Sequence, residues 1–387
     1  MWNETVGSVA LTLAGPGAVY LAALTAAAAL PARRNAPAAV DADALRVVVL
    51  VPAHNESSGL LRTLRSLRAE AAGDAFTRIV VVADNCSDDT AAVARAEGVE
   101  VLERHDQAQR GKGHALQFGF DALPGADWFI VIDADTSVEP GFLAAMRRAM
   151  AGGADALQCR YGVRDAFSSR RNTLADVALG GWNVLRPRGR AALGLSAGIL
   201  GNGFALSRRT LERVPYGARS IVEDVEYHQM LVRAGLGVRW VDDAQVRGDM
   251  PDASAASAQQ RARWEGGRLR LMADKAPALA RRVLKGYWRM ADPLLDLLLL
   301  PLSWHVALLL AALLLGGGLV QALALGALAT VGLHVLLALR LIRARRAHVR
   351  ALLGVPFYLV WKLRLAGSTL QAAGRNAVWV RSVRSAV

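Results

Sequence analysis

The sequence predicts an α/β domain with a mostly parallel sheet, joined to α-helices that cross a membrane or lie on its surface. Short apolar runs alternate with segments of helical spacing between residues 45 and 264, which is typical of parallel strands joined by helices. Long uncharged segments lie near both ends of the chain. Polar and acidic turns follow several of the apolar runs, and ligands bind at that edge of open α/β sheets.

The first uncharged segment, from Val6 to Leu30, is long enough to cross a bilayer. Glu4 precedes it and Arg33 and Arg34 follow it, whereas a cleavable signal carries its positive charge in front. We therefore expect an uncleaved anchor over residues 1–34 with its N-terminus outside. A buried core helix is the alternative, although such helices rarely run this long without a polar face.

The alternation in residues 45–264 predicts the central elements of the domain. Strands are expected at residues 47–51, 78–83, 99–103 and 128–132, and helices at residues 60–71, 90–97 and 111–120. The strand at 128–132 runs directly into Asp133 and Asp135. Two carboxylates one residue apart suit a divalent cation that carries phosphates. A strand followed by acidic turn residues is also common without any ligand.

Three further turns lie beside expected strands or helices. Residues 52–56 follow the first strand and residues 84–90 the second, where Ser87 and Asp88 could equally be helix caps. The segment 111–113 precedes a helix and offers a lysine and free backbone N–H groups to phosphate. The glycine spacings of a Walker loop and of a dinucleotide fingerprint are absent, which argues against a dehydrogenase.

The second half of the domain is less regular. Residues 201–203 (Gly-Asn-Gly) allow close approach of a ligand to the backbone or form a plain turn. Glu223, Asp224 and Glu226 lie at an expected helix start, where the macrodipole also favours acids. Residues 259–264 combine arginines with a tryptophan, which suits a phosphorylated sugar or a basic helix on a membrane surface.

The C-terminal third returns to the membrane. Residues 265–292 mix arginine and lysine with apolar residues, as in helices that lie on an anionic leaflet. Leu294 to Leu315 and Leu319 to Leu339 read as two spans within a hairpin over residues 293–340. Residues 341–387 form a basic cytosolic tail, in which we expect an interfacial helix at 351–365, with a fourth span as the alternative.

Charge and cysteine content narrow the possible partners. The net charge of +13 fits nucleic acid, anionic lipid or phosphorylated substrates. No zinc-finger spacing or RNA-binding signature is present, so we expect no nucleic-acid partner. Cys86 and Cys159 form no disulfide framework and suit free thiols in a reducing compartment.

Taken together, these residues resemble family-2 glycosyltransferases of the GT-A fold, over roughly residues 46 to 270. The matching segments are residues 51–56, 84 with 87–90, 133–135, 201–203, 223–224 and 260–264. The last of these, Gln-x-x-Arg-Trp, is shared with cellulose, chitin and hyaluronan synthases and with ceramide glucosyltransferases. One departure is His54, where tyrosine is more usual.

The resemblance implies how the sugar nucleotide is bound. Pro52, Ala53 and Glu56 would line the base and ribose, and Asp84 would hydrogen-bond the base, usually uracil. Lys112 would face the diphosphate. The implied donor is therefore a UDP-sugar.

The resemblance also implies the catalytic groups. Asp133 and Asp135 would hold Mg²⁺ or Mn²⁺ on the diphosphate, and Asp224 would be the general base. Further residues would contact the leaving group or the acceptor: Gly203, Glu223, Gln260, Arg263 and Trp264. One base acting through the acceptor gives inversion at the anomeric carbon, without the second, nucleophilic carboxylate of a retaining hydrolase.

The expected protein is an inverting, metal-dependent hexosyltransferase in the inner (plasma) membrane, with several spans and a cytoplasmic catalytic domain. Its acceptor would be a lipid, a lipid-linked sugar or a glycan, and anionic lipids and other copies of the chain are possible partners. The main alternative is a processive polysaccharide synthase that exports its product. A binding subunit without activity would not need Asp224, and a nucleotidyltransferase would not explain residues 260–264.

Overall fold

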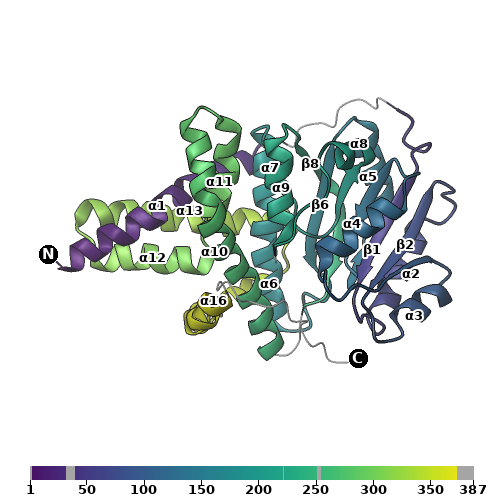
Figure 1. Ribbon diagram of the computed structural model, residues 1–387. Coiled ribbons are helices and arrows are strands. Elements are labelled where there is room, and N and C mark those ends of the chain that lie inside the picture. The colour runs from purple at the N-terminus through teal and green to yellow at the C-terminus, as the bar shows by residue number, and fades with distance from the viewer. Residues whose placement is uncertain (1, 32–39, 221, 251–253, 373–387) are drawn as a thin grey trace. The chain divides into compact units, whose positions relative to one another are not determined.

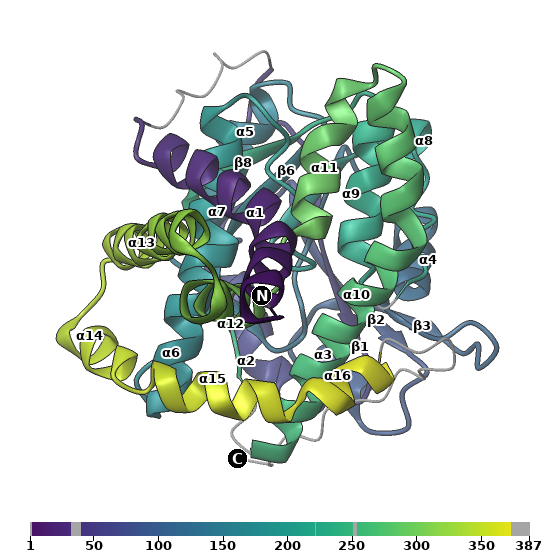
Figure 2. The same ribbon diagram turned by 90° about the vertical axis from the view of Figure 1, so that its left-hand side faces the viewer.

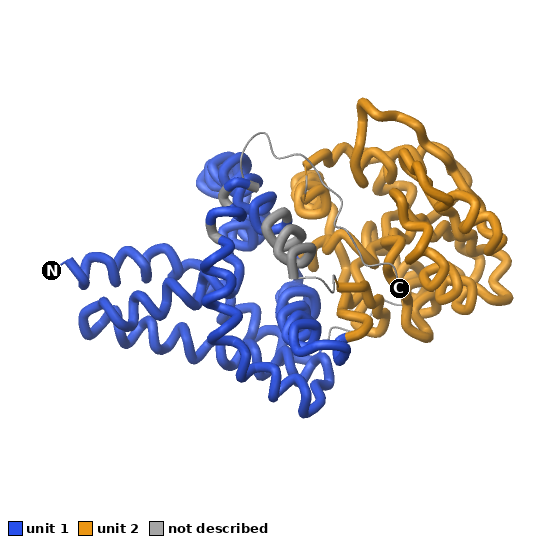
Figure 3. The backbone as a smooth tube through the Cα atoms, turned by 90° about the horizontal axis from the view of Figure 1, so that it is seen from below, with its two compact units in different colours: residues 1–32, 166–195, 254–382 blue, residues 33–165, 196–253, 383–387 orange. Residues whose placement is uncertain are grey.

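The computed structural model describes residues 2–31, 40–220, 222–250 and 254–372, and for residues 254–263, 366, 370 and 372 it describes the backbone alone. The chain divides into two compact units (Figure 3). The α/β unit comprises residues 33–165, 196–253 and 383–387, and the helical unit comprises residues 1–32, 166–195 and 254–382.

The described part of the α/β unit is built on one sheet of eight strands in the order β3-β2-β1-β4-β7-β6-β8-β5 (Figure 1). The strands are β1 (Val47–Ala53), β2 (Thr77–Asp84), β3 (Glu100–Arg104), β4 (Trp128–Val131), β5 (Thr136–Val138), β6 (Ala156–Val163), β7 (Phe204–Ser207) and β8 (Val238–Gly248). The pairs β1–β2, β1–β4, β2–β3 and β6–β8 are parallel, whereas β4–β7, β6–β7 and β5–β8 are antiparallel.

Helices of this unit connect the strands and cover the sheet. They are α2 (Leu60–Glu70), α3 (Thr90–Ala96), α4 (Lys112–Ala122), α5 (Phe142–Ala151), α8 (Arg208–Arg213) and α9 (Glu223–Arg233). Val49, Val51 and Ile130 from the central strands are at most 2% exposed and belong to one apolar core with Leu64 of α2 and Met146 of α5. Burial on both faces explains why these strands read as continuous β-branched runs.

The predicted α/β class with a mostly parallel sheet is confirmed. The expected strands at 47–51, 78–83, 99–103 and 128–132 correspond to β1 to β4, and the expected helices correspond to α2, α3 and α4. The sequence did not indicate β5 to β8. Their pairings with β4 and with one another are largely antiparallel and join segments far apart in the chain.

The helical unit contains two described helices that are long and apolar enough to cross a membrane, α1 (Trp2–Ala28) and α13 (Gly318–Leu341). They lie side by side with α12 (Leu302–Leu315), as Figures 1 and 2 show. The expected span from Leu294 to Leu315 is not one straight helix. It is bent by 80° between α11 (Ala291–Leu298) and α12. The two helices make a third span only if the bent pair crosses the membrane as one segment.

The bend has a local cause in Pro301. Proline lacks a backbone N–H group and disfavours helical geometry in the residue before it, so a helix cannot continue through Leu300 without strain. Leu299 ends α11 in an extended conformation, and Pro301 precedes the first residue of α12.

Residues 166–195 belong to the helical unit, although the expected domain of 45–264 includes them. They form α6 (Arg170–Leu179), a π-helical segment η1 (Gly180–Leu185) and α7 (Arg186–Ala192). Gly189 packs so closely on α1 that a side chain would collide with the Leu24 carbonyl oxygen. A Cβ atom at Gly181 would lie 3.0 Å from His334 Nε2 of α13. Small residues at these positions let the helices approach closely.

A buried ionic cluster joins α1, α7, α10 (Ser254–Leu284) and α11. Tyr20 donates a hydrogen bond of 2.6 Å to Asp292, and Arg190 Nε lies 3.2 Å from the same carboxylate. Asp296 forms ion pairs with three guanidinium groups, those of Arg186, Arg190 and Arg268. Arg268 is therefore buried in the unit, whereas the sequence placed it on a membrane-facing surface.

The chain continues through three short described helices: α14 (Arg346–Leu352), α15 (Val355–Arg364) and α16 (Ala366–Ala372). Each is shorter than the roughly 20 residues that a membrane span needs. Lys362 of α15 forms a buried ion pair with Glu265, which ties α15 to α10.

Candidate active site

The candidate site lies at the C-terminal edge of the parallel strands of the α/β unit. β1 and β2 stay in register as far as Ala53 and Ala83, and Leu50 of β1 pairs with Val131 at the end of β4. The turns after these three strands therefore begin at the same edge of the sheet. The last residues of these strands and the turns after them carry the predicted residues Pro52, Ala53, Glu56, Asp84, Asp133 and Asp135.

Lys112, the first residue of α4, links three predicted parts of the site. Its ammonium group donates hydrogen bonds to the Asp133 carboxylate and to the carbonyl oxygen of Gly201. Burial opposes the charge on Lys112, but the carboxylates of Asp133 and Glu223 outweigh this effect and raise its pKa. A permanent positive charge therefore lies between the acidic turn after β4 and the acidic start of α9.

Glu223 and Asp224 form the first turn of α9. A Cβ atom on Gly201 would lie 3.2 Å from Asp224 Oδ2, so the Asp224 carboxylate rests against the Gly-Asn-Gly turn. Burial raises the pKa of Glu223 to about 7; the charge of Lys112 opposes the rise and that of Asp224 adds to it. The two neighbouring acids are therefore coupled: the charge on Asp224 affects the pH at which Glu223 loses its proton.

Glu226, the third acid of this run, has a different task. Its Oε2 atom accepts hydrogen bonds from the backbone N–H groups of Arg219 and Ser220, at 3.1 and 3.0 Å. These bonds hold the loop before α9. The acid therefore stabilises the approach to the helix and is not a free proton acceptor.

The Asn202 side chain holds the acidic turn of residues 133–136 in place. Its Oδ1 atom accepts the backbone N–H of Asp133 at 3.1 Å, and its Nδ2 group donates to Thr136 Oγ1 at 2.8 Å. Asn202 is 1% exposed, and its own carbonyl accepts a hydrogen bond of 2.8 Å from Gln158. Both ends of the turn are thereby fixed to one buried amide.

Two half-buried carboxylates flank one buried residue of this turn. Ala134 is buried and its carbonyl accepts a hydrogen bond from Thr63, whereas Asp133 and Asp135 on either side of it are half-buried. Thr136 Oγ1 donates to Asp135 Oδ1 at 3.2 Å. A core residue thus lies between two partly exposed acids in the segment that joins β4 to β5.

The donor set fits a divalent cation that takes its other ligands from substrate. No group of three or more metal-ligating side chains occurs in the described part of the chain. Asp133 already binds a cationic group, the Lys112 ammonium, so the turn attracts positive charge. Mg²⁺ and Mn²⁺ sites commonly consist of one or two carboxylates completed by phosphate oxygens and water.

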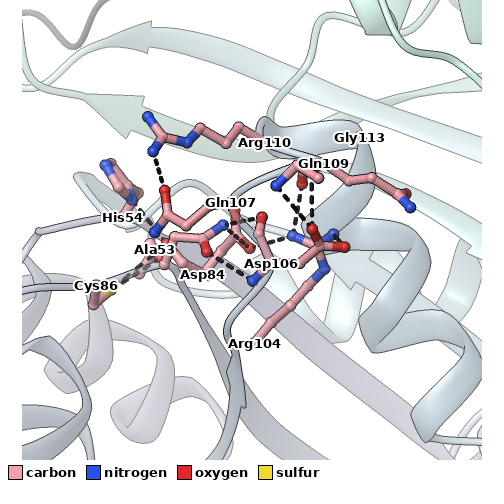
Figure 4. A network of polar contacts seen from close by, with 12 residues as sticks. Ala53, His54, Asp84, Cys86, Arg104, Asp106, Gln107, Gln109, Arg110 and Gly113 are labelled. Atoms are coloured by element: carbon pink, nitrogen blue, oxygen red, sulfur yellow. Dashed lines mark hydrogen bonds and ion pairs between the residues drawn. The ribbon is translucent and has the colours of Figure 1, made fainter.

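Asp84 takes part in a buried network that shapes the neighbouring loop (Figure 4). Its Oδ1 atom accepts hydrogen bonds from Arg104 Nη1 at 2.7 Å and from Asn85 Nδ2 at 3.1 Å. Arg104 also donates to Asp106 Oδ2 at 3.1 Å and to the Gln109 carbonyl at 2.8 Å. One oxygen of the predicted base-binding carboxylate is therefore used to hold residues 105–111, the loop that leads to Lys112.

The turn after β1 is held against the turn after β2. The Asn55 side chain accepts the backbone N–H of Ser87 at 2.7 Å, and the Glu56 N–H donates to Thr90 Oγ1 at 2.8 Å. His54 Nδ1 lies 2.7 Å from the carbonyl oxygen of Asp84. Asn55 has a φ of 55°, a conformation that asparagine tolerates better than most residues.

The remaining predicted residues lie elsewhere. Gly203 is buried within the sheet, where a Cβ atom would lie 3.0 Å from Val246, and its expected acceptor contact stays a prediction. Trp264 belongs to α10 of the helical unit and is 40% exposed. The side chains of Gln260 and Arg263 lie outside the described residues, so their expected contacts stay predictions.

Two residues of the site were not expected from the sequence. Asn202 was noted only as part of a turn, and Arg104 was not singled out. Both act through contacts across strands: Asn202 reaches the turn after β4, and Arg104 at the end of β3 reaches Asp84 at the end of β2. The one available signal was the position of each residue at a predicted strand end or turn.

Comparison with known proteins gives an independent view of this chain. The family model described as "Glycosyltransferase like family 2" matches residues 45–267. The probable glycosyltransferase YdaM of Bacillus subtilis is 26% identical over 234 residues, which cover 57% of this chain and 55% of YdaM. The chain thus matches about half the length of that relative.

A solved structure with a similar fold covers nearly the whole chain. The mannosyltransferase PcManGT from Pyrobaculum calidifontis, solved with GDP-Man and Mn²⁺, superimposes with a TM-score of 0.55. It is 17% identical, and the match covers 97% of this chain and 99% of PcManGT. Glucosyl-3-phosphoglycerate synthase from Mycobacterium tuberculosis, solved with Mn²⁺, UDP and phosphoglyceric acid, is 22% identical with a TM-score of 0.41, over 56% of this chain and 75% of the synthase.

Proposed function

Since the chain belongs to glycosyltransferase family 2, we propose that it transfers a hexose from a UDP-sugar to a lipid, lipid-linked or glycan acceptor, with inversion and with Mg²⁺ or Mn²⁺. The observation that supports this best is the convergence of Lys112, Asp133 and Asp224 around the Gly201 turn. Cation-binding groups and a candidate base thus occupy one edge of the sheet.

The leaving diphosphate gains negative charge as the sugar departs, and this charge needs stabilisation. Asp133 and Asp135 would hold the metal, which supplies Lewis-acid stabilisation when bound. Lys112 is already placed beside Asp133 and carries a charge that its surroundings reinforce. In the complex we expect the ammonium group to turn from Asp133 toward a phosphate oxygen.

The acceptor hydroxyl must lose a proton, and Asp224 is the proposed base. It lies against Gly201, close to Lys112, so a sugar positioned by the diphosphate would meet it. Glu223 stands beside it with a pKa of about 7, a value suited to proton transfer near neutral pH. We assign the role of base to Asp224 and the positioning of the acceptor to Glu223. Comparing the turnover of Asp224→Asn with that of Glu223→Gln tests these two roles.

Transfer of one or a few sugars is favoured over processive synthesis with export. A polymer channel needs polar groups along its wall, because hydrated hydroxyls cannot face lipid. In the sequence of the C-terminal hairpin, Asp296 and Gln321 are nearly the only acidic or amide residues that could line a channel. Asp296 is instead neutralised by three arginines in the buried cluster, which leaves it unsuited to line a channel.

We place the enzyme in the inner membrane with the α/β unit on the cytoplasmic side. Support comes from the two membrane-length helices and from the arginines that flank them: Arg33, Arg34, Arg340, Arg343, Arg345 and Arg346. Positive residues beside membrane spans are retained on the cytoplasmic side.

The test is a screen of the purified full chain against UDP-sugars, in which UDP release is followed with and without candidate lipid acceptors. We expect metal-dependent release with at least one UDP-sugar, and stronger release when the acceptor is present. GDP-Man, the ligand named for PcManGT, is the matched competitor. Release from GDP-sugars alone would contradict the UDP assignment, and no release from any nucleotide sugar would contradict the proposed reaction.

A further inference from the structure

A groove in the helical unit, apart from the residues proposed for sugar transfer, has the chemistry of a lipid headgroup site. It lies between α6 and α15, whose adjacent positions are visible in Figure 2, and encloses about 340 Å³. Its walls include two arginines and four large apolar or aromatic residues: Arg170, Arg171, Leu174, Phe357, Tyr358 and Trp361.

The two arginines carry unpaired charge. Within the described part of the chain, neither guanidinium group has a carboxylate within ion-pair distance or a hydrogen-bond partner. Asp176, the acid on the same helix, lies 3.1 Å from His348 and is engaged there. The Arg170 side chain lies over Gly354, where a Cβ atom would be 3.3 Å from Nε. Among the residues that the structure describes, the two positive charges of the groove therefore have no counter-charge.

The position of the arginines adds to this excess. They are the first two residues of α6, and the first turn of α6 contains no acid. The N-terminal end of a helix already carries partial positive charge, so cations there destabilise the helix and anions stabilise it. A local arrangement that costs stability without an internal compensation often marks a functional site. An anion bound at the groove would supply the missing compensation.

The opposite wall is apolar and continues into an exposed surface. Phe357 is 80% exposed, and the exposed Val360 and Leu363 share its helical spacing on α15. Val349 of α14 and Leu353, which follows α14, are exposed apolar residues of the neighbouring segment, and we call these five residues the apolar strip. Exposed apolar residues beside arginines are typical of a helix that lies in a membrane interface. The same unit supplies membrane-length helices, and α15 packs against α12 of their bundle.

We propose that this groove binds the phosphate of an anionic membrane phospholipid, with its acyl chains along the apolar strip. The guanidinium groups match phosphate oxygens in charge and geometry. A volume of about 340 Å³ accommodates a headgroup and glycerol and leaves the chains outside. This site is separate from the sugar-transfer chemistry, so it stands or falls independently of the proposed function.

The test uses the full chain in a neutral detergent and measures single-lipid binding by native mass spectrometry. Phosphatidylglycerol is the probe and phosphatidylcholine the neutral comparison. We expect the wild type to prefer phosphatidylglycerol, and Arg170→Gln/Arg171→Gln to weaken its binding about tenfold, to the level of phosphatidylcholine. The matched control Arg281→Gln/Arg282→Gln removes the same charge from α10 and is expected to change affinity less than twofold.

Thermal melting gives a second readout that also verifies folding. Because the double substitution removes two cations from the positive end of α6, we expect a melting temperature equal to or above that of the wild type without lipid. Phosphatidylglycerol should then raise the melting temperature of the wild type more than that of the variant.

Three results would overturn the proposal. The first is equal binding of the two phospholipids by the wild type, and the second is an equal loss in the α10 control, which would indicate unspecific charge attraction. The third is displacement of phosphatidylglycerol by millimolar inorganic phosphate, or binding of a polyprenyl phosphate in preference to phosphatidylglycerol. Those outcomes would assign the groove to a free anion or to an acceptor lipid.

Discussion

Asp224 is the residue on which the proposed chemistry depends most directly. We expect Asp224→Asn to reduce turnover by about 10²–10⁴-fold, the usual cost of removing a general base. UDP affinity should change little, because the amide keeps the size of the side chain. Turnover is measured as acceptor-dependent UDP release and affinity by calorimetry. Near-normal turnover of Asp224→Asn together with an inactive Glu223→Gln would move the base to Glu223.

Glu223 links the site to the pH dependence of stability. Its pKa is raised from 4.5 to about 7 by burial, so the folded protein holds its proton over a range where the unfolded chain does not. The stability from this group is therefore complete below pH 4.5 and is lost as the pH rises to 7. We expect the wild type to lose melting temperature over this range relative to Glu223→Gln, whose amide does not titrate. Parallel profiles of the two proteins would contradict the raised pKa.

The Asp133–Asp135 turn predicts that UDP affinity depends on a divalent metal. If a cation bridges the turn and the diphosphate, UDP should bind more tightly with Mn²⁺ than in EDTA, and Asp135→Ala should remove most of this difference. Calorimetric titration of UDP under both conditions measures it. Asp165→Ala, an exposed acid in the same unit, is the control. Equal affinity in Mn²⁺ and EDTA would contradict a metal-bridged diphosphate.

At the scale of an element, the loop between β3 and α4 depends on one buried ion pair. Arg104 and Asp84 have side chains only 9% and 8% exposed. Removing one partner leaves an uncompensated buried charge, which typically costs about 3–5 kcal/mol. We expect Arg104→Met to lower the melting temperature and to weaken UDP binding, since the loop leads to Lys112. The double variant Asp84→Asn/Arg104→Met should recover stability, and a double variant as unstable as Arg104→Met would show that charge is not the cause.

The strands that were predictable lie in the first half of the domain, where strands and helices alternate regularly along the chain. β1 to β4 are apolar runs separated by helices, so local periodicity and topology rules agree on them. β7 lies between β4 and β6 in the sheet, and β8 lies between β6 and β5. No local pattern specifies such pairings, because they depend on which distant segments meet.

The same limit applies to the site. Asp133 and Lys112 were recognisable because a strand end and a helix start each favour ligand-binding groups. Asn202 and Arg104 act through tertiary contacts with residues 69 and 20 positions away, and nothing in their local sequence announces this. The bend at Pro301 had a local signal, but hydropathy alone indicated a continuous span.

At the scale of the whole molecule, each of the two units is built from several separate segments of the chain. Residues 166–195 leave the α/β unit between β6 and β7 and pack among α1 and α13 before the chain returns. Two covalent connections therefore flank this excursion, at residues 165–166 and 195–196, in addition to those at residues 32–33 and 253–254. The chain therefore passes repeatedly between the unit with the membrane-length helices and the unit with the candidate site.

The length of the product depends on the whole molecule. The described helical unit offers two membrane-length helices and at most one further bent span, and its acid Asp296 is paired with arginines. A hydrated glycan would then meet apolar walls inside one chain, and this opposes export. We expect the purified monomer, given UDP-sugar and lipid, to yield short lipid-attached products, measured by mass spectrometry. A channel shared by several chains would instead make product length rise with oligomer size, so monomeric and oligomeric fractions are compared. A long polymer from the monomer, or one translocated across sealed proteoliposomes, would establish processive synthesis instead.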